Sequence, residues 1–253
     1  MSIVDSFDAQ SSAVFSPCDV YKPLEGFPEI ALIAFNRRMV DFAVGQPGAR
    51  EITKLHYAVY EIPVYALKWQ GRDIAVCVSF EGSGGAAMVM EELIALGART
   101  FLAIGSCGCL DADIAEGHLI VPTAAYRDEG TSYHYAPASD YIDIPTAAEL
   151  SAAFDAISMP HVQGKTWTTD AIYRETRDGL AKRRAEGCIT VEMECASLMA
   201  VGQFRKKAVY QFLYAEDCLD SVEWDPRIMG KQPAIAYEGY LDVALECAIR
   251  VKG

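Results

Sequence analysis

Two carboxylates separated by one residue occupy a position that favours a functional site. The motif Glu192-Met193-Glu194 lies between mostly apolar residues at 189–191 and 195–196, at a predicted junction of a strand and a helix. A solvated acidic helix start, stabilised by the helix dipole, is the alternative. Because the flanking residues are too apolar for a surface, we favour a site whose carboxylates are perturbed by their surroundings.

A second acidic pair, Glu216-Asp217, ends the predicted buried strand at residues 209–214. In open α/β sheets, ligands bind outside the carboxyl ends of strands, and a carboxylic acid there can transfer a proton to a reacting group. The alternative is an acidic turn residue, since Asp220 and Glu223 follow closely. Both interpretations are kept at this point.

Two turns of small residues are predicted on successive strands. Gly82-Ser83-Gly84-Gly85 precedes a predicted helix, and Gly105-Ser106-Cys107-Gly108 follows the buried stretch 101–104. Glycines let backbone N–H groups approach a ligand, and a helix amino terminus attracts anions. A tight turn without a ligand is an equal alternative for the first motif. Together the two turns predict a shared pocket at the carboxyl ends of the strands.

An alternating series of elements must position these residues. Short apolar runs predict strands, and apolar residues at helical spacing predict helices between them. The predicted strands are 30–33, 59–66, 74–79, 100–104, 118–124 and 209–214, and the predicted helices are 38–43, 86–96, 194–204 and 234–251. This alternation indicates an α/β fold. Because no repeat or linker interrupts it, we expect residues 1–253 to form a single domain.

Composition narrows the function class. The chain has 253 residues and a formal net charge of −13, which disfavours nucleic-acid binding because that depends on Lys and Arg neutralising phosphates. No apolar run is long enough for a membrane span and no secretory signal is evident, so we expect a soluble, cytoplasmic protein. The eight cysteines contain no paired CxxC motifs of a zinc site. We interpret all except Cys107 as reduced core thiols.

The ordered motifs jointly resemble the nucleoside phosphorylase family, which includes uridine phosphorylases and hexameric purine nucleoside phosphorylases. The motifs are Gly82–Gly85 with Glu91-Glu92-Leu93, Ile104–Gly108, Gly117–Val121, Thr169–Tyr173 and Val191–Glu194. The resemblance implies a three-layer α/β/α fold around a mixed, partly barrel-like sheet. It also implies homodimers that assemble into homohexamers, and cleavage of a nucleoside by inorganic phosphate to free base and ribose 1-phosphate. That chemistry requires no cofactor and no metal.

The resemblance assigns the sugar and the leaving group. Glu194 is expected to accept hydrogen bonds from the ribose 2′- and 3′-hydroxyls, with Met193 packed on the sugar and Glu192 close by. Asp217 matches the acid that protonates or hydrogen-bonds purine N7, and uridine phosphorylases lack it. Asp217 therefore favours a purine nucleoside, although Glu216 replaces the small residue that usually precedes the acid.

The resemblance also places the base. The base is expected to contact Cys107 and Gly108 on one side and Ile172 and Tyr173 on the other, with Arg177 beyond them. The glutamine with which uridine phosphorylases read uracil is absent after Tyr173. A solvated loop remains an equal alternative for Arg177.

The phosphate site departs from the family pattern. Ser106 and Arg50 match its hydroxyl and its arginine from the neighbouring subunit, and Arg38 is a candidate for the amino-terminal arginine. Ala103 stands where phosphorylases usually have another arginine. Losing such a charge-assisted contact removes about 1.5–3 kcal/mol, or roughly one to two factors of ten in affinity.

Ala103 leaves three interpretations open. Another cation such as Arg38 or Lys54 substitutes, phosphate is bound poorly, or water is the nucleophile, as in related nucleosidases. Phosphorolysis of a purine nucleoside stays ahead because Arg50 and Ser106 coincide. The alternatives are a phosphate-independent nucleosidase, a uridine phosphorylase and a catalytically weak nucleoside-binding protein.

Overall fold

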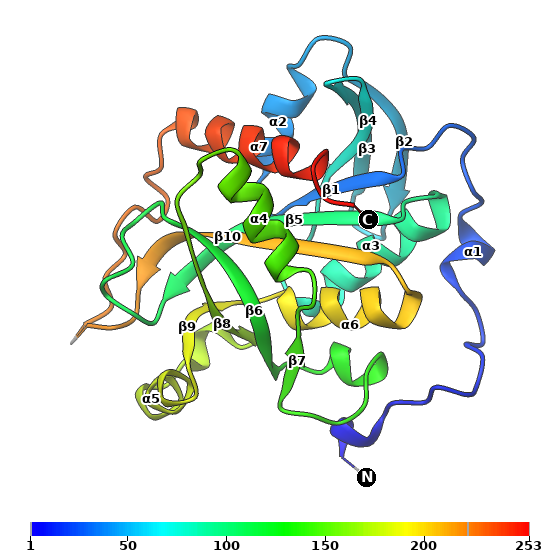
Figure 1. Ribbon diagram of the computed structural model, residues 1–253. Coiled ribbons are helices and arrows are strands. Elements are labelled where there is room, and N and C mark those ends of the chain that lie inside the picture. The colour runs from blue at the N-terminus through cyan, green and yellow to red at the C-terminus, as the bar shows by residue number, and fades with distance from the viewer. Residues whose placement is uncertain (1, 222, 253) are drawn as a thin grey trace.

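The computed structural model describes residues 2–221 and 223–252 and contains one continuous mixed sheet (Figure 1). The strands are β1 (Ile30–Ala34), β2 (Arg50–His56), β3 (Glu61–Trp69), β4 (Arg72–Val78), β5 (Thr100–Cys109), β6 (Leu119–Asp128), β7 (Tyr141–Asp143), β8 (His161–Thr169), β9 (Cys188–Glu192) and β10 (Ala208–Cys218). The helices are α1 (Pro17–Val20), α2 (Arg37–Val44), α3 (Ser83–Leu96), α4 (Ala147–Ala156), α5 (Arg177–Ala185), α6 (Cys195–Arg205) and α7 (Ala234–Ala248). Short 3-10 helices lie at Ile3–Asp5, Thr131–His134 and Ile172–Arg174.

Half of the sheet closes on itself. The strands β5, β10, β6, β8 and β9 pair in that order, and β9 pairs back with β5 where Gly108 lies opposite Val191. The remaining strands extend the sheet from β5 through β1, β4 and β3 to β2. Parallel and antiparallel pairs both occur, so the prediction of a mixed, partly barrel-like sheet is confirmed.

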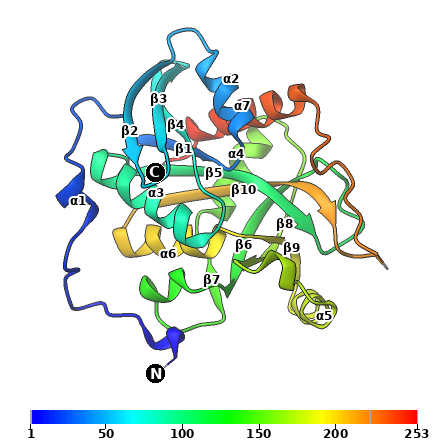
Figure 2. The same cartoon turned by 180° about the vertical axis from the view of Figure 1, so that it is seen from behind.

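Helices cover both faces of the sheet, so the fold has three layers, with the sheet in the middle. Helices α3 and α6 pack together on one face, and α2, α7 and α4 lie on the other (Figures 1 and 2). The guanidinium of Arg205 on α6 forms an ion pair with the buried Glu91 of α3, and its Nε lies 2.9 Å from both carboxylate oxygens. None of the helices in the described ranges combines the length and apolar character that crossing a bilayer requires.

The apolar runs predicted most of the sheet. Strands β1, β3, β4, β5, β6 and β10 and helices α2, α3, α6 and α7 are confirmed within a few residues at their ends. Strands β2, β7 and β8 and helices α1, α4 and α5 are absent from the prediction, and β9 is predicted only as the strand before Glu192-Met193-Glu194, without bounds. The one continuous sheet, from residue 30 to residue 218, supports our inference of a single domain.

The second predicted turn is wrong. Gly105–Gly108 continues strand β5 to Cys109, because β10 pairs with it on one side and β9 on the other. The small residues at positions 105–108 leave room for neighbouring side chains. A Cβ on Gly105 would lie 3.1 Å from the Phe35 ring, and one on Gly108 would lie 2.5 Å from Leu219.

Two helical glycines give opposite predictions for stability. A Cβ on Gly202 of α6 would lie 2.3 Å from Val209 Cγ2, whereas one on Gly239 of α7 meets no atom within 4 Å. We expect Gly202→Ala to lower the free energy of unfolding by about 1–3 kcal/mol through overpacking. Gly239→Ala should raise it by about 0.5–1 kcal/mol because alanine favours the helix. Urea unfolding of both variants measures the effects, and equal effects would contradict the packing of α6 on β10.

Candidate active site

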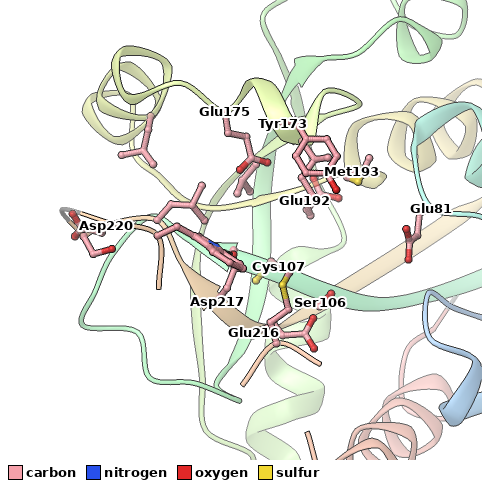
Figure 3. Close-up of a pocket in the computed structure, with 18 of the residues that line it drawn as sticks. Glu81, Ser106, Cys107, Tyr173, Glu175, Glu192, Met193, Glu216, Asp217 and Asp220 are labelled. Atoms are coloured by element: carbon pink, nitrogen blue, oxygen red, sulfur yellow. Dashed lines mark hydrogen bonds between the residues drawn. The ribbon is translucent and has the colours of Figure 1, made fainter. Parts of the chain in front are cut away.

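A cavity of about 1130 Å³ opens at the carboxyl ends of β5, β9 and β10 (Figure 3). The loop after β8 and the loop after β10 complete its walls. All the predicted site residues except Arg38 and Arg50 line it: Ser106, Cys107, Gly108, Ile172, Tyr173, Arg177, Glu192, Met193, Glu194 and Asp217. The chain therefore brings its two acidic motifs together in one pocket, and the individual roles stay predictions.

The first glycine turn binds the protein's own carboxylates. The Gly82 N–H donates to Glu194 Oε1 at 2.7 Å, and the Ser83 N–H donates to Asp170 Oδ1 at 2.8 Å. Gly82 has φ +89°, a conformation that favours glycine. The anion-binding start of α3 is thus occupied from within the chain, and the turn orients Glu194 towards the pocket it lines.

Glu192 is held at both carboxylate oxygens. Its Oε2 accepts from the N–H groups of Glu194 and Cys195 at 2.8 and 2.7 Å, and its Oε1 accepts from Thr168 Oγ1 at 2.5 Å. These bonds cap α6 and join it to β8. Burial raises the pKa of Glu192 to about 7 even though the hydrogen bonds favour the charged form. With its acceptors used in this way, Glu192 positions Met193 and Glu194.

Of the two acids, Glu194 has the more strongly raised pKa. Its side chain is buried, and burial followed by repulsion from Glu192 raises its pKa to about 8. Two carboxylates this close in a low-dielectric site disfavour double ionisation. Hydrogen-bond donors from a ligand would stabilise the charged form of Glu194. The pair is therefore suited to binding hydroxyl groups.

Asp217 reaches the pocket through an irregularity in β10. The register of β10 against β5 shifts between Ala215 and Asp217, which leaves Asp217 opposite Gly108. Trp224 Nε1 donates to Asp217 Oδ2 at 2.7 Å, and burial raises the pKa of Asp217. A Cβ on Gly108 would lie 3.0 Å from Asp217 Oδ1, so glycine leaves room for this carboxylate.

Four further acids line the cavity that sequence reasoning did not assign: Glu81, Glu175, Glu216 and Asp220. Burial, followed by repulsion from Asp217, raises the pKa of Glu175 to about 7. Glu216 of β10 and Glu81 of the turn before α3 line the same cavity as Ser106 (Figure 3). Glu81 and Glu216 each directly precede a predicted motif, and this position in the sequence is the feature that could have identified them as site residues.

The candidate phosphate cations do not enter the cavity of their own chain. Arg50 is exposed at the start of β2, and Lys54 pairs with Glu61 at 2.9 Å. Arg38 lies over the Tyr237 ring, 5.4 Å from its centroid. Among the described residues, the lining contains two cationic side chains, Arg177 and Arg184, and Arg184 pairs with Asp220.

No metal centre is evident in the described ranges, where no cluster of three or more His, Cys, Asp or Glu side chains is arranged to hold an ion. The eight cysteines are all free thiols. Cys107 is a mostly buried part of the cavity wall, with its Sγ 3.6 Å from the Tyr214 carbonyl oxygen, and burial raises its pKa well above the ordinary value. Cys107 is therefore a packing residue of the wall and not a thiolate.

Comparison with known proteins agrees with the motifs. A guanosine phosphorylase from Halorubrum lacusprofundi is 32% identical over 147 residues, which cover 56% of this chain and 60% of that protein. A uridine phosphorylase from Escherichia coli is 28% identical over 162 residues, which cover 56% of this chain and 62% of that protein. The matches thus span about three fifths of each relative.

Solved structures share the fold over nearly the whole chain. A uridine phosphorylase from Vibrio fischeri superposes with a TM-score of 0.77 at 21% identity, covering 91% of this chain and 95% of that one. A purine nucleoside phosphorylase from Toxoplasma gondii in complex with immucillin-H gives 0.73 at 18% identity, covering 98% and 96%. The family model described as "Phosphorylase superfamily" matches residues 29–228. With the three-layer fold and the acidic pocket in place, this match shows that the chain belongs to the phosphorylase superfamily.

Proposed function

We propose that the protein cleaves the N-glycosidic bond of a purine nucleoside and transfers the ribosyl group to inorganic phosphate. The products are the free base and ribose 1-phosphate. The observation that carries this proposal is the single cavity that holds both the Glu192–Glu194 motif and Asp217. The guanosine and uridine phosphorylases among its relatives support phosphate as the acceptor.

The reaction needs charge stabilisation and one proton. As the bond between C1′ and the base nitrogen breaks, its electron pair leaves with the base and positive charge develops on the sugar. Asp217, whose pKa is raised by burial, donates its proton to purine N7. A phosphate oxygen then bonds to C1′. Glu194 accepts hydrogen bonds from the ribose hydroxyls, and its charge favours the cationic sugar.

The base is proposed to lie between two walls. Cys107 and Gly108 of β5 form one wall, and the other is formed by Ile172 and Tyr173 of the loop after β8 and by Arg177 at the start of α5. Tyr173 is 96% exposed, so its ring is available for stacking on a purine. Because each step is proton transfer or charge stabilisation by side chains, the mechanism uses no cofactor besides the co-substrate phosphate.

Assembly into homodimers and then a homohexamer is part of the proposal. Arg50 is exposed and lies outside its own chain's cavity, which supports its role as a phosphate ligand in a neighbouring subunit. Arg38 would be a second ligand of the phosphate, provided by the chain that forms the cavity. Eight unpaired thiols support a reducing, cytoplasmic location.

Hydrolysis is the second candidate function. Ala103 replaces the expected arginine, and the space around Ser106 carries Glu81 and Glu216 instead of cations. Carboxylates repel a phosphate dianion but not water. In that case, ribose replaces ribose 1-phosphate as the product.

A product assay tests the function and its acceptor. The purified protein would be incubated with guanosine, inosine, adenosine or uridine, with and without phosphate. We expect faster release of purine bases than of uracil, and ribose 1-phosphate as the product when phosphate is present. Equal rates without phosphate, with ribose as the product, would establish hydrolysis instead. Binding without base release would identify a nucleoside-binding protein.

Replacing Asp217 tests the leaving-group acid. Asp217→Asn keeps the shape and the acceptor oxygen for Trp224 but cannot donate a carboxylic proton, so kcat/KM for a purine nucleoside should fall about 10²- to 10⁴-fold. Asp225→Asn is the matched control because Asp225 is exposed and lies in the segment that follows β10, close to Asp217 in sequence. Unchanged cleavage by Asp217→Asn would exclude Asp217 as the acid.

Light scattering tests the assembly. We expect a mass of six chains, and loss of most phosphate-dependent activity in Arg50→Ala without loss of folding, because the arginine would be missing from every neighbouring site. A fully active monomer would exclude this role of Arg50.

A further inference from the structure

Asp217 is held by a neutral hydrogen-bond donor. The indole Nε1 of Trp224 donates to Asp217 Oδ2 at 2.7 Å, and both residues line the cavity. The next cation along the chain is directed elsewhere: Arg227 Nη1 donates to the Ile114 carbonyl oxygen at 2.6 Å, and its Nη2 donates to that of Ala112 at 3.1 Å. One oxygen of the proposed acid is therefore bound by an uncharged group.

The backbone brings the indole back to the acid. Cys218 and Asp225 exchange two backbone hydrogen bonds, of 2.9 and 3.1 Å, as an antiparallel bridge. Asp217 directly precedes the first partner of this bridge, and Trp224 directly precedes the second. The bridge thus holds the backbone of Trp224 close to the end of β10.

Two arginines of α5 hold the chain just after β10. Arg184 forms an ion pair with Asp220, and Arg177 Nη1 donates to the Ser221 carbonyl oxygen at 3.1 Å. Among the described residues, these arginines are the two cationic side chains of the cavity lining. The loop that carries Trp224 is therefore fixed at its base by the bridge and on its α5 side by two arginines.

The indole distinguishes the two oxygens of Asp217. An indole N–H is a donor only, and the carbonyl oxygen of a protonated carboxyl group accepts a hydrogen bond better than its hydroxyl oxygen does. Because Oδ2 accepts from Trp224, the proton of the acid belongs on Oδ1. A Cβ on Gly108 would lie 3.0 Å from Oδ1, so this oxygen lies beside the strand proposed as one wall of the base site.

A neutral donor suits an acid that must keep its proton. A cation in hydrogen-bond contact would strongly favour the carboxylate. The indole also lowers the pKa of Asp217, but burial is the larger effect and raises it. The other ionisable groups that act on Asp217 are the carboxyl groups of Glu175, Glu216 and Asp225, the thiols of Cys107 and Cys109, and the guanidinium of Arg227.

We propose that Trp224 is the positioning residue of the leaving-group acid: its indole N–H holds Asp217 Oδ2, so that the proton on Oδ1 faces the base. The inference rests on the proposed function for the identity of the acid. In this step the bond between Oδ1 and its proton breaks, the proton bonds to purine N7, and the electron pair of the glycosidic bond passes into the base. The carboxylate that remains keeps the indole hydrogen bond, which is stronger to the charged form.

Removing the indole N–H tests this role. Trp224→Phe keeps an aromatic ring without a donor, and Trp224 is 58% exposed, so its replacement leaves the core intact. We expect kcat/KM for guanosine to fall about tenfold to a hundredfold. The loss of activity at high pH should move to higher pH, because the variant lacks a donor that favours the carboxylate and the pKa of Asp217 rises.

A nucleoside that needs no proton separates positioning from a general loss of activity. The base of 7-methylguanosine is cationic before cleavage and leaves as a neutral molecule, so Asp217 has no proton to transfer. We expect its cleavage by Trp224→Phe to stay within about threefold of that by the unmodified protein. An equal fall with guanosine and 7-methylguanosine would overturn the inference, because the indole would then not act through the proton.

Trp69→Phe is the matched control. Trp69 Nε1 also donates to a carboxylate, Glu246 Oε1 at 2.9 Å, but neither residue lines the cavity. This variant should therefore keep the rate and the pH profile of the unmodified protein. Circular dichroism checks that each variant is folded.

The contact can also be measured without turnover. Indole emission responds to the protonation state of a neighbouring carboxyl group, so the difference in emission between the unmodified protein and Trp224→Phe should change with pH. The same difference, measured in proteins that carry Asp217→Asn, should not. An identical pH dependence in both pairs would overturn the inference, whatever the activity. If the unmodified protein releases no purine base, the proposed function fails, while the emission titration still decides whether Trp224 holds Asp217.

Discussion

The buried carboxylate of Glu192 is the interaction on which the site is built. An ionised carboxylate in a protein interior is tolerated only when its oxygens are paired, and Glu192 pairs them with two N–H groups of α6 and a threonine of β8. These bonds fix the start of α6 relative to the barrel. They also set the backbone of residue 194, whose side chain then caps α3 through Gly82. The carboxylate of Glu192 thus joins β8 to α6, and the carboxylate of Glu194 joins the same segment to the start of α3.

Barrel closure supplies the other half of the site. The strands β5 and β9 meet at Gly108 and Val191, and both residues line the cavity. A regular β10 would alternate its side chains between the two faces of the sheet. The irregularity between Ala215 and Asp217 breaks that alternation. Bulges re-aim side chains in this way near functional sites, and here Glu216 and Asp217, although adjacent in sequence, both line the cavity.

The sequence predicted the parts of this arrangement that depend on local patterns. Apolar runs such as 100–104 and 209–214 identify central strands, and Glu192-Met193-Glu194 is conspicuous in apolar surroundings. Apolar patterning does not identify strand β8 because its buried end, Thr166–Thr169, contains three threonines. These threonines are buried by the strands that pair around them in the barrel. The turn predicted at Gly105–Gly108 is a strand because its partners come from β9 and β10, far along the chain.

The charge of the cavity has opposite consequences for the two halves of the reaction. Negative charge from Glu194 and its neighbours lowers the energy of a sugar that becomes cationic as the base departs. The same charge raises the energy of any anion that approaches the sugar, because the two interactions act over similar distances in the same low-dielectric space. Among the described residues, the cavity lining holds seven acidic side chains and two cationic ones, Arg177 and Arg184. In the proposed reaction, the chain's own carboxylates would favour departure of the base, whereas phosphate capture would depend on a cation from outside the cavity, such as the proposed Arg50 of a neighbouring subunit.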